Sequence, residues 1–325
     1  MIPEKQLAVL NDFFIPISKS ILFPEIKLEF ALYLSKGETY TPYINPGQIL
    51  TVDKIKQIDA DGIETLFILR SHSEFFKNYL NYNLGDVLNN KNLPIATRAH
   101  IYYSSTQLLA IEAINNCLPH NLPDEHYRQI LKLAEMGTEL LVEQGAFEDI
   151  ANYVAYDNRG FNHSINVFIY NIALLRQYGF DMADLFKFGV GSLIHDIGSS
   201  TIPQNILCKA PPLSSVEKAL LETHTSRGHA MCVNLLLSQE IKDCILLHHE
   251  RLDGKGYPCG SIGSEIPVYV KSLSLADRYD RLVTGYSMDR AYTSFEALKL
   301  IKEEVGAAYD RDLYMALVLS LSTAK

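Results

Sequence analysis

The sequence predicts a mainly α-helical protein with a small α/β module at its N-terminus. Three observations lead to this prediction. Strand-like runs rich in aromatic and β-branched residues are confined to residues 1–90. From Pro94 onward, apolar residues recur at three- and four-residue spacing, which is typical of amphipathic helices. In the C-terminal half, histidines and aspartates recur inside apolar helical segments, where a core face would otherwise carry aliphatic side chains.

Residues 1–90 are expected to form a regulatory or interaction domain. The segments "KLEFALYLS" and "TYTPYI" are strand candidates, and the turn signal Asn45-Pro46-Gly47 ends the second of them. "IETLFIL" predicts a short buried strand, and "SEFFKNYLNYNL" after it has helical spacing. What this domain senses is not specified by its residues.

Residues 91–150 are expected to form a helical connector. The segments "PIATRAHIYYSSTQLLAIEAINNCL" and "PDEHYRQILKLAEMGTELLVEQG" each begin with proline, which suits the first turn of a helix. We expect these helices either to pack on the next domain or to dimerise beside it, so a homodimer is an open alternative.

Composition limits the classes of function. The chain has 325 residues, 47% of them hydrophobic and 21% charged, which is typical of a globular protein with about two domains. Its net charge of -9 argues against a binder of nucleic-acid polymers or anionic membranes, whose affinity depends on clustered lysine and arginine. A single bound nucleotide stays compatible, because a metal ion can supply local positive charge.

The N-terminal segment and the cysteines favour a cytoplasmic location. "MIPEKQLAVL" has no basic region followed by a long apolar stretch, and no run approaches the roughly 18 apolar residues that span a bilayer. The five cysteines are odd in number and lack CxxC spacing. We therefore expect free thiols in a reducing compartment and no membrane span.

Residues 151–325 concentrate imidazoles and carboxylates in apolar helical segments. The candidates are His163, His195, Asp196, His224, His248, His249, Asp277 and Asp280. A single buried histidine is more often a core residue than a ligand, but a shared metal site accounts for five such segments together. Imidazoles with a bridging carboxylate can hold two divalent cations about 3.5–4 Å apart, which activate water and stabilise a phosphoryl transition state.

The doublet "HD" at 195–196, together with "HHERLDGKGYP", resembles the HD-GYP family, a branch of the HD phosphohydrolases that hydrolyses cyclic di-GMP. The similarity covers about residues 150–315 and is supported by "IPQNILCKAPPLSSVE" and "GSEIPVYVKSLSLADRYD". The resemblance implies that residues 151–325 form an all-helical HD-type bundle with a metal-binding catalytic site.

The resemblance also implies a ligand set for two metal ions. One ion would be held by His163, His195, Asp196 and Asp277, and the other by His224, His248 and His249, with Asp196 bridging. His195 and Asp196 are the expected catalytic pair. The metals are expected to be iron or manganese, and iron also suits a nitrogen and oxygen ligand set.

The loop that follows the histidine doublet is expected to serve the same site. Asp-Gly and Gly-Tyr-Pro form tight turns in many proteins, but here they directly follow two candidate ligands. Gly256 and Tyr257 are expected to face the nucleotide or a protein partner. We expect Glu250 to support a ligand histidine by hydrogen bonding, and Asp280 to orient neighbouring groups rather than to bind metal.

Three positions depart from the family pattern. The family's "HDIGK" reads "HDIGS", so Ser199 replaces a lysine. In an ungapped alignment, Tyr286 stands at the place of an arginine in the segment after the last metal aspartate, where Arg290 remains basic. Some members have a glutamate four residues before His163 that completes a third metal site; here Arg159 predicts two metals. Arg159 and Arg290 are the cations expected at the substrate.

Together these features predict a two-metal phosphodiesterase that hydrolyses cyclic di-GMP, or a related cyclic dinucleotide, to linear pGpG or GMP through a metal-bound water. The alternative is a catalytically weak or inactive receptor or scaffold that binds metal and nucleotide and signals through a partner at the GYP loop or the N-terminal domain. The complete ligand set favours the enzyme, whereas Ser199 and the altered 281–290 segment favour the receptor. Action on an unrelated phosphoester is a third alternative.

Overall fold

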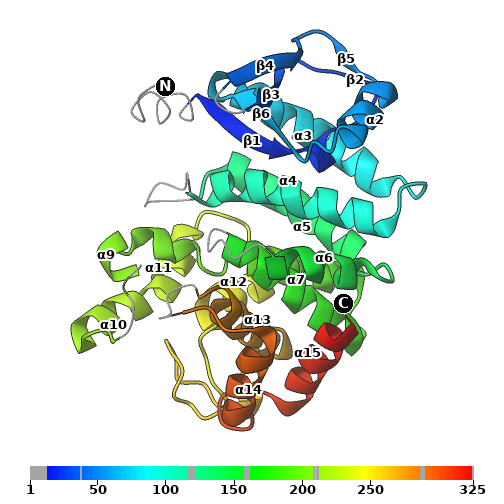
Figure 1. Cartoon of the computed structure of the whole chain (residues 1–325). Coiled ribbons are helices and arrows are strands. Elements are labelled where there is room, and N and C mark those ends of the chain that lie inside the picture. The colour runs from blue at the N-terminus through cyan, green and yellow to red at the C-terminus, as the bar shows by residue number, and fades with distance from the viewer. Residues whose placement is uncertain are drawn as a thin grey trace. The chain divides into compact units, whose positions relative to one another are not determined.

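The computed structural model in Figure 1 describes residues 13–36, 39–115, 122–156, 162–207, 209, 212–285 and 290–323. Internal contacts divide the chain into two compact units, Met1–Ser105 and Thr106–Lys325. The boundary lies inside helix α4 (Ile95–Asn115). The division into three parts at 90 and 150 stays a prediction.

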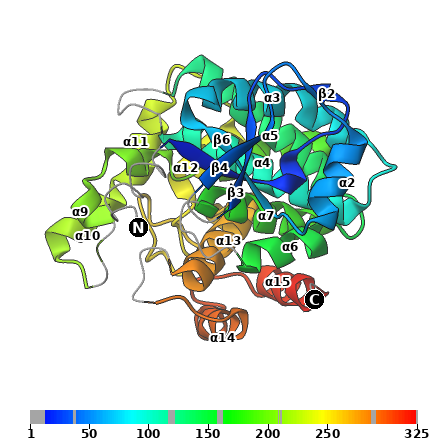
Figure 2. The same cartoon turned by 45° about the horizontal axis from the view of Figure 1, so that its top comes forward.

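The N-terminal unit is built on a four-stranded antiparallel sheet with the strand order β1-β6-β3-β4. Figure 2 labels three of these strands, β6, β3 and β4, close together. The strands are β1 (Phe14–Ser18), β6 (Thr65–Leu69), β3 (Leu32–Lys36) and β4 (Thr39–Ile44). The three predicted strands correspond to β3, β4 and β6, whereas β1 was not predicted.

A second ribbon and two helices complete this unit. The ribbon pairs β2 (Ile26–Lys27) with β5 (Ile49–Leu50), so the start of the first predicted strand belongs to a separate pair. Helix α3 (Ser73–Asn89) confirms the predicted helix, and helix α2 (Val52–Ala60) was not predicted. Thr51 begins α2, because its hydroxyl accepts a hydrogen bond from the Lys54 N–H.

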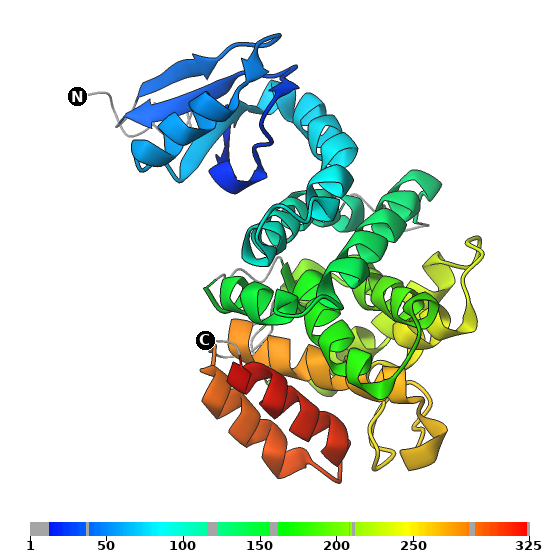
Figure 3. The same cartoon turned by 90° about the vertical axis from the view of Figure 1, so that its right-hand side faces the viewer.

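The C-terminal unit is a helical bundle. Figure 3 shows its last two helices, α14 and α15, side by side. The helices are α5 (Asp124–Leu141), α6 (Ala146–Tyr156), α7 (His163–Leu175), α8 (Met182–Ile194), α9 (Gln204–Leu207), α10 (Ser215–Glu222), α11 (His224–Met231), α12 (Gln239–Leu247), α13 (Val268–Thr284), α14 (Ser294–Glu304) and α15 (Arg311–Thr323). The predicted mainly helical fold class is confirmed.

Helix α7 is the centre of this bundle. Almost all of its residues are buried, and it packs against α8 on one side and α13 on another. Helices α5 and α6, which belong to the predicted connector, pack on α7 and α8 within this unit. The ends of α7, α8 and α13 therefore lie on the same core.

Two glycines allow the segments around the centre to approach closely. A β-carbon on Gly191 of α8 would lie 2.6 Å from the side chain of Cys244 in α12. A β-carbon on Gly198, in the short 3-10 helix η5 (Ile197–Thr201), would collide with the backbone of His224 and Gly228 in α11. Because neither glycine has a side chain, the histidines of α11 and α12 come within reach of the helix end at Asp196.

Candidate metal centre

The structure brings all the predicted metal ligands of the C-terminal unit together around Asp196. Ligand atoms of Asp196, His224, His248 and His249 lie within 4.8 Å of one another, and so do those of Asp196, His163 and His195. Asp277 joins the second group, with its Oδ1 3.0 Å from Nε2 of His163 and 3.6 Å from Nε2 of His195.

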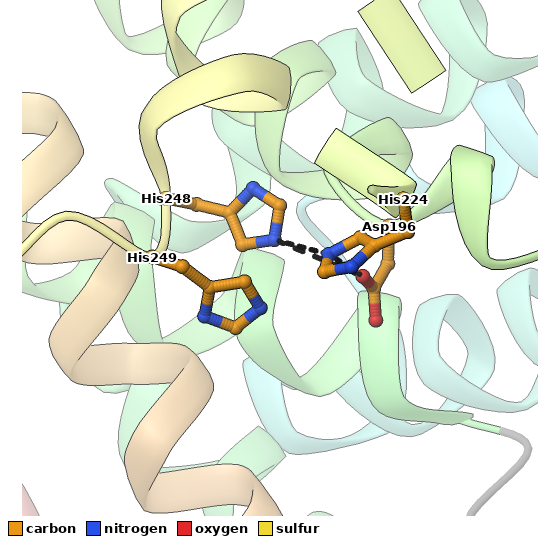
Figure 4. Close-up of side chains that lie close together, drawn as sticks. All are labelled: Asp196, His224, His248 and His249. Carbon is orange, nitrogen blue, oxygen red and sulfur yellow. Dashed lines mark hydrogen bonds and ion pairs between the residues drawn. The ribbon is translucent and has the colours of Figure 1, made fainter. Parts of the chain in front are cut away.

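These side chains come from the ends of different helices. His163 begins α7, His195 directly follows α8, and His224 begins α11. His248 and His249 follow α12, as Figure 4 shows, and Asp277 lies within α13. The bundle thus gathers five separate segments of its core at one point, and most of the ligand side chains are buried.

The two oxygens of Asp196 face different histidines. Its Oδ1 lies 3.1 Å from Nε2 of His224 and 3.7 Å from Nε2 of His248. Its Oδ2 lies 3.8 Å from Nε2 of His163 and 4.0 Å from Nε2 of His195. We call His163, His195 and Asp277 the first half of the centre, and His224, His248 and His249 the second half. Asp196 stands between them.

Hydrogen bonds at Nδ1 fix the tautomers of three histidines. In each ring Nδ1 lies beside backbone carbonyl oxygens, which can only accept, so Nδ1 carries the proton and Nε2 presents a lone pair. The acceptors are Ser192 O for His195 (2.7 Å), Leu221 O for His224 (2.7 Å), and Cys244 O (3.1 Å) and Ile245 O (3.0 Å) for His248. This outer arrangement is typical of metal-binding imidazoles.

Asp280 orients the remaining histidine of the first half. Its Oδ2 lies 2.7 Å from Nδ1 of His163, and its Oδ1 accepts a hydrogen bond of 2.9 Å from the Asn166 amide. The Asp280 side chain is fully buried one helical turn beyond Asp277. It therefore holds the His163 ring from behind, while Nε2 of that ring faces Asp196 and Asp277.

The arrangement of the histidine Nε2 atoms suits metal binding better than hydrogen bonding between the rings. Within the described part of the chain, Nε2 of His195 has no hydrogen-bond partner although the residue is fully buried. Nε2 of His224 lies 3.2 Å from Nε2 of His248, and the Nδ1 bonds make both atoms acceptors. Two lone pairs at that distance require a proton or a cation between them, so the residues suit bound metal ions.

The electrostatics prepare the carboxylates for cations. Burial raises the pKa of Asp196 and Asp277, but the nearby Arg281 guanidinium and hydrogen bonds from histidines outweigh it and hold both pKa values well below the usual range. Burial lowers the pKa of His248 to about 4. Burial and Arg281 lower the pKa of His163, but hydrogen bonds with Asp277 and Asp280 outweigh them and raise it to about 9.

Arg281 lies at the centre and was not predicted. Its Nη2 donates to Oδ2 of Asp196 at 2.9 Å, and its Nε donates to Oδ1 of Asp277 at 2.8 Å. Arg281 is four residues after Asp277 on α13, so the two side chains share a helix face. That spacing was the available signal, but it could not show that the same guanidinium also reaches Asp196.

Some of the positions that bear on the family pattern lie within the described residues, and others lie outside them. Ser199 is nearly buried, and its hydroxyl donates to Oδ1 of Asp196 at 3.2 Å. Arg290 pairs with Glu296 at 3.1 Å and lies over the Tyr292 ring, with 4.0 Å between its guanidinium carbon and the ring centroid. Its role at a substrate stays a prediction. The predictions for Arg159 and Tyr286 lie outside the described residues.

The loop after the histidine doublet packs over the centre. The Tyr257 ring lies 4.8 Å from the His249 ring, measured between centroids. A β-carbon on Gly256 would lie within 2.6 Å of the backbone of His249, Glu250 and Arg251. Glycine at this position therefore lets the loop pass directly beside the histidine doublet.

The Glu250 side chain holds the far end of the GYP loop. The buried Glu250 carboxylate accepts backbone N–H bonds from Cys259 at 2.7 Å, Gly260 at 3.2 Å and Ser261 at 2.9 Å. Its predicted support of a ligand histidine stays a prediction.

A cleft of about 410 Å³ opens onto the centre, and its lining includes one ligand of each half, Asp277 and His249. Gly256, Tyr257 and Arg281 line it beside these ligands. Other charged side chains line it as well, namely Lys218, Glu222, Arg251, Lys255, Arg278 and Glu304. The cleft combines ligand side chains, an aromatic ring and several cations, and these are the groups that an anionic ligand with aromatic rings would contact.

Comparison with known proteins agrees with this geometry. Residues 169–313 match the family described as HD domain. The chain is 28% identical over 185 residues to the cyclic di-GMP phosphodiesterase PA4108 of Pseudomonas aeruginosa, covering 57% of this chain and 44% of that protein. It is 29% identical over 160 residues to the 3'3'-cGAMP-specific phosphodiesterase 3 of Vibrio cholerae, covering 49% and 35%. The chain thus spans less than half the length of either relative.

A solved structure shares the fold. It is Bd1817, a HDG"Y"P protein from Bdellovibrio bacteriovorus, which matches with a TM-score of 0.67 at 22% identity and covers 95% of this chain and 99% of its own. In addition, no helix in the described ranges is long and apolar enough to cross a bilayer. From the matched HD domain and the curated relatives, we conclude that the C-terminal part of this chain contains an HD domain and resembles the HD-GYP family.

Proposed function

We propose that this chain is a metal-dependent phosphodiesterase that hydrolyses cyclic di-GMP, or a related cyclic dinucleotide such as 3'3'-cGAMP, to linear products. One observation carries the proposal: the two oxygens of Asp196 each face a separate pair of histidine Nε2 atoms. Such a shared carboxylate is what a centre for two divalent cations requires. The names of the curated relatives support the substrate class.

The residues would hold one cation in each half. His163, His195 and Asp277 would bind the first, His224, His248 and His249 the second, and Asp196 both; iron or manganese is the expected metal. When bound, two such ions supply Lewis acidity and lower the pKa of a water. The protein itself contributes fixed Nε2 lone pairs, because backbone carbonyls and Asp280 hold the opposite ring nitrogens.

The surrounding groups would position the substrate. Tyr257 and the backbone at Gly256 line the cleft beside His249, where a base could stack or a ribose could lie. Lys218 and Lys255, which also line the cleft, would neutralise the phosphodiester charge as it approaches the centre. The Gly256 backbone keeps the loop close to the histidine doublet.

The test is hydrolysis by the metal-loaded protein under anaerobic conditions. Cyclic di-GMP and 3'3'-cGAMP are each incubated with protein loaded with Fe²⁺ or Mn²⁺, and the products are separated by chromatography. We expect linear pGpG or GMP from cyclic di-GMP, and no product from Asp196→Asn. Full metal occupancy without turnover of any cyclic dinucleotide would contradict the proposal.

A receptor or scaffold is the second candidate, and Ser199 is the observation that favours it. A neutral hydroxyl contacts Asp196 where the family pattern has a lysine, so one source of positive charge at the phosphate is missing. Calorimetry that shows tight nucleotide binding without hydrolysis would support this candidate. In that case the GYP loop or the N-terminal unit would transmit the signal to a protein partner. A homodimer and a cytoplasmic location stay predictions under both candidates.

A further inference from the structure

We propose that Arg281 is the phosphate-binding cation of this centre, and that it takes over from α13 the positive charge that the chain lacks at Ser199. The proposal rests on the function proposed above, because it assigns the residue that contacts the anionic part of the substrate. The ligand is a phosphate group, whether free or within a phosphodiester.

Position is the first argument. Arg281 contacts Oδ2 of Asp196 at 2.9 Å and Oδ1 of Asp277 at 2.8 Å, and it also lines the cleft that opens onto the centre. Its side chain is 18% exposed, so one part of it is packed among the carboxylates while another reaches solvent. A phosphate that enters the cleft toward Asp277 would therefore meet this guanidinium.

Charge is the second argument. Arg281 is always protonated, and its partners in the structure include the carboxylates of Asp196 and Asp277. Those same oxygens face Nε2 atoms of the first half, so divalent cations bound there would neutralise them. The charge of Arg281 then lacks compensation from these carboxylates. An anion in the cleft supplies that compensation, and a guanidinium suits phosphate oxygens in particular.

The other arginines of the cleft are engaged differently. Arg278, one turn earlier on α13, pairs with Glu304 at 3.0 Å. Arg251 pairs with Asp253 at 3.0 Å and with Glu304 at 3.2 Å. Neither Asp253 nor Glu304 belongs to the two groups of candidate metal ligands. Metal loading would therefore change the charge balance of Arg281 and leave that of Arg278 and Arg251 as it is.

Ser199 and Arg281 meet at one carboxylate. The Ser199 hydroxyl donates to Oδ1 of Asp196, and the Arg281 guanidinium donates to Oδ2 of the same side chain. The two residues therefore approach the metal-bridging position from η5 and from α13. A lysine at 199 and an arginine at 281 would deliver positive charge to the same small region, so one can substitute for the other.

The experiment measures binding of inorganic phosphate to the full chain loaded with Mn²⁺, by isothermal titration calorimetry. We expect Arg281→Ala to weaken phosphate binding by about 10- to 100-fold, since a charge-assisted hydrogen bond is lost. Arg281→Lys should retain most of the affinity. Arg278→Ala is the matched control, because it removes a paired cation from the same helix and cleft; it should stay within about threefold of the wild type.

A second set of variants separates charge from packing. Arg281→Gln keeps hydrogen-bond donors beside the carboxylates but no charge, and it should weaken phosphate binding as Arg281→Ala does. Ser199→Lys should restore phosphate binding in the Arg281→Ala background and add little to the wild type. Manganese content is measured for every variant, so that phosphate affinities are compared at equal occupancy.

The outcomes are distinct from those of the hydrolysis test. Phosphate affinity that is unchanged in both Arg281→Gln and Arg281→Ala at full manganese occupancy would overturn the proposal, and Arg281 would then only neutralise the metal-free carboxylates. Equal losses in Arg278→Ala and Arg281→Ala would also overturn it, because any cleft cation would serve. Phosphate binding that depends on Arg281 without turnover of cyclic dinucleotides would uphold this inference and contradict the enzyme.

Discussion

The two halves of the centre share Asp196 but differ in charge. The first half sets His163 and His195 against Asp277, with Asp280 behind His163 and Arg281 across both carboxylates. The second half consists of His224, His248 and His249 around the other oxygen of Asp196. The first half is thus rich in carboxylates and carries its own cation, whereas the second is almost entirely imidazole.

Two halves with the same number of ligands can therefore differ in charge. A divalent cation in the first half gains the attraction of two carboxylates but must reorganise the ion pairs of Arg281. A cation in the second half meets three imidazoles, and the Nε2 atoms of His224 and His248 lie 3.2 Å apart. We therefore expect the two ions to differ in affinity and in their response to pH.

Removal of the shared ligand should break both halves at once. Asp196→Asn replaces two anionic oxygens by one neutral carbonyl and an amide, so we expect activity to fall by at least about 10³-fold. Metal analysis should show fewer than two ions per chain. The matched control is Asp184→Asn, a partly exposed carboxylate at the start of α8, the helix that ends two residues before Asp196, and it should leave both readouts unchanged. Retention of two ions by Asp196→Asn would refute the bridging role.

The halves should also separate by pH. His163 of the metal-free protein has a pKa raised to about 9, so a cation entering the first half at pH 7 must displace a proton. Its affinity should rise by roughly tenfold per pH unit between pH 7 and 9 and then level off. In the second half, burial lowers the pKa of His248 to about 4, so that ring is already neutral at pH 7.

The free energy of unfolding of the metal-free protein should fall as the pH rises, whereas the metal affinity of the first half should rise. The pKa of His163 is raised above its unfolded value, so protonation of His163 stabilises the folded state fully below about pH 6.5. This contribution to the free energy of unfolding is lost as the pH rises through 9. Titration with Co²⁺, followed by absorption, and thermal melts of the metal-free protein would measure the two trends. Parallel pH slopes for the two ions would argue against the asymmetry. Burial lowers the pKa of His224, but its hydrogen bond with Asp196 outweighs burial and raises that pKa, so the second half also responds to pH.

Asp280 should act on the first half alone. Asp280→Asn weakens the hold on Nδ1 of His163, and loss of such an outer carboxylate typically lowers metal affinity by about 10- to 100-fold. We expect competition with a chelator to show this loss for one ion and no change for the other. The unaffected ion is the internal control. A loss shared equally by both ions would show that the halves do not bind independently.

The smallest effect should come from outside the centre. Glu250→Gln removes a charge that holds three N–H groups of the GYP loop, so we expect a loss of about 1–3 kcal/mol in the free energy of unfolding. Metal content should stay at two ions per chain, because the Glu250 carboxylate contacts the loop. A measured loss of metal would instead favour the predicted support of a ligand histidine. Chemical denaturation and metal analysis on the same sample decide between the two.

Local sequence was a good guide to elements with a clear apolar or aromatic pattern. Helices α4 and α5 follow from apolar spacing over many turns, and β3, β4 and β6 follow from aromatic and β-branched runs. Strand β1 and helix α2 were missed. Strand β1 is held by its pairing with β6, which lies about 50 residues later in the chain, and α2 begins at a single threonine cap.

The ligands of the centre could be predicted because their residue types and motifs are read directly from the sequence. A histidine or an aspartate is a candidate metal ligand because of its residue type, whatever its helix packs against. Arg281 and Glu250 differ, since what matters is which distant groups they touch. Nothing local to Arg281 shows that Asp196, 85 positions away, shares its guanidinium. Nothing local to Glu250 shows that its carboxylate turns toward the loop at 259–261.

The sequence by itself determined the mainly helical class, the small N-terminal α/β module, and the set of imidazoles and carboxylates that could hold metal. The tertiary structure alone decided how those groups are divided around the two oxygens of Asp196, and which cation stands beside them. The physical reason is the separation along the chain over which each effect acts. Helix spacing and ligand chemistry act within a few residues, whereas the distribution of charge in the centre depends on distances of a few ångströms between segments brought together by the core.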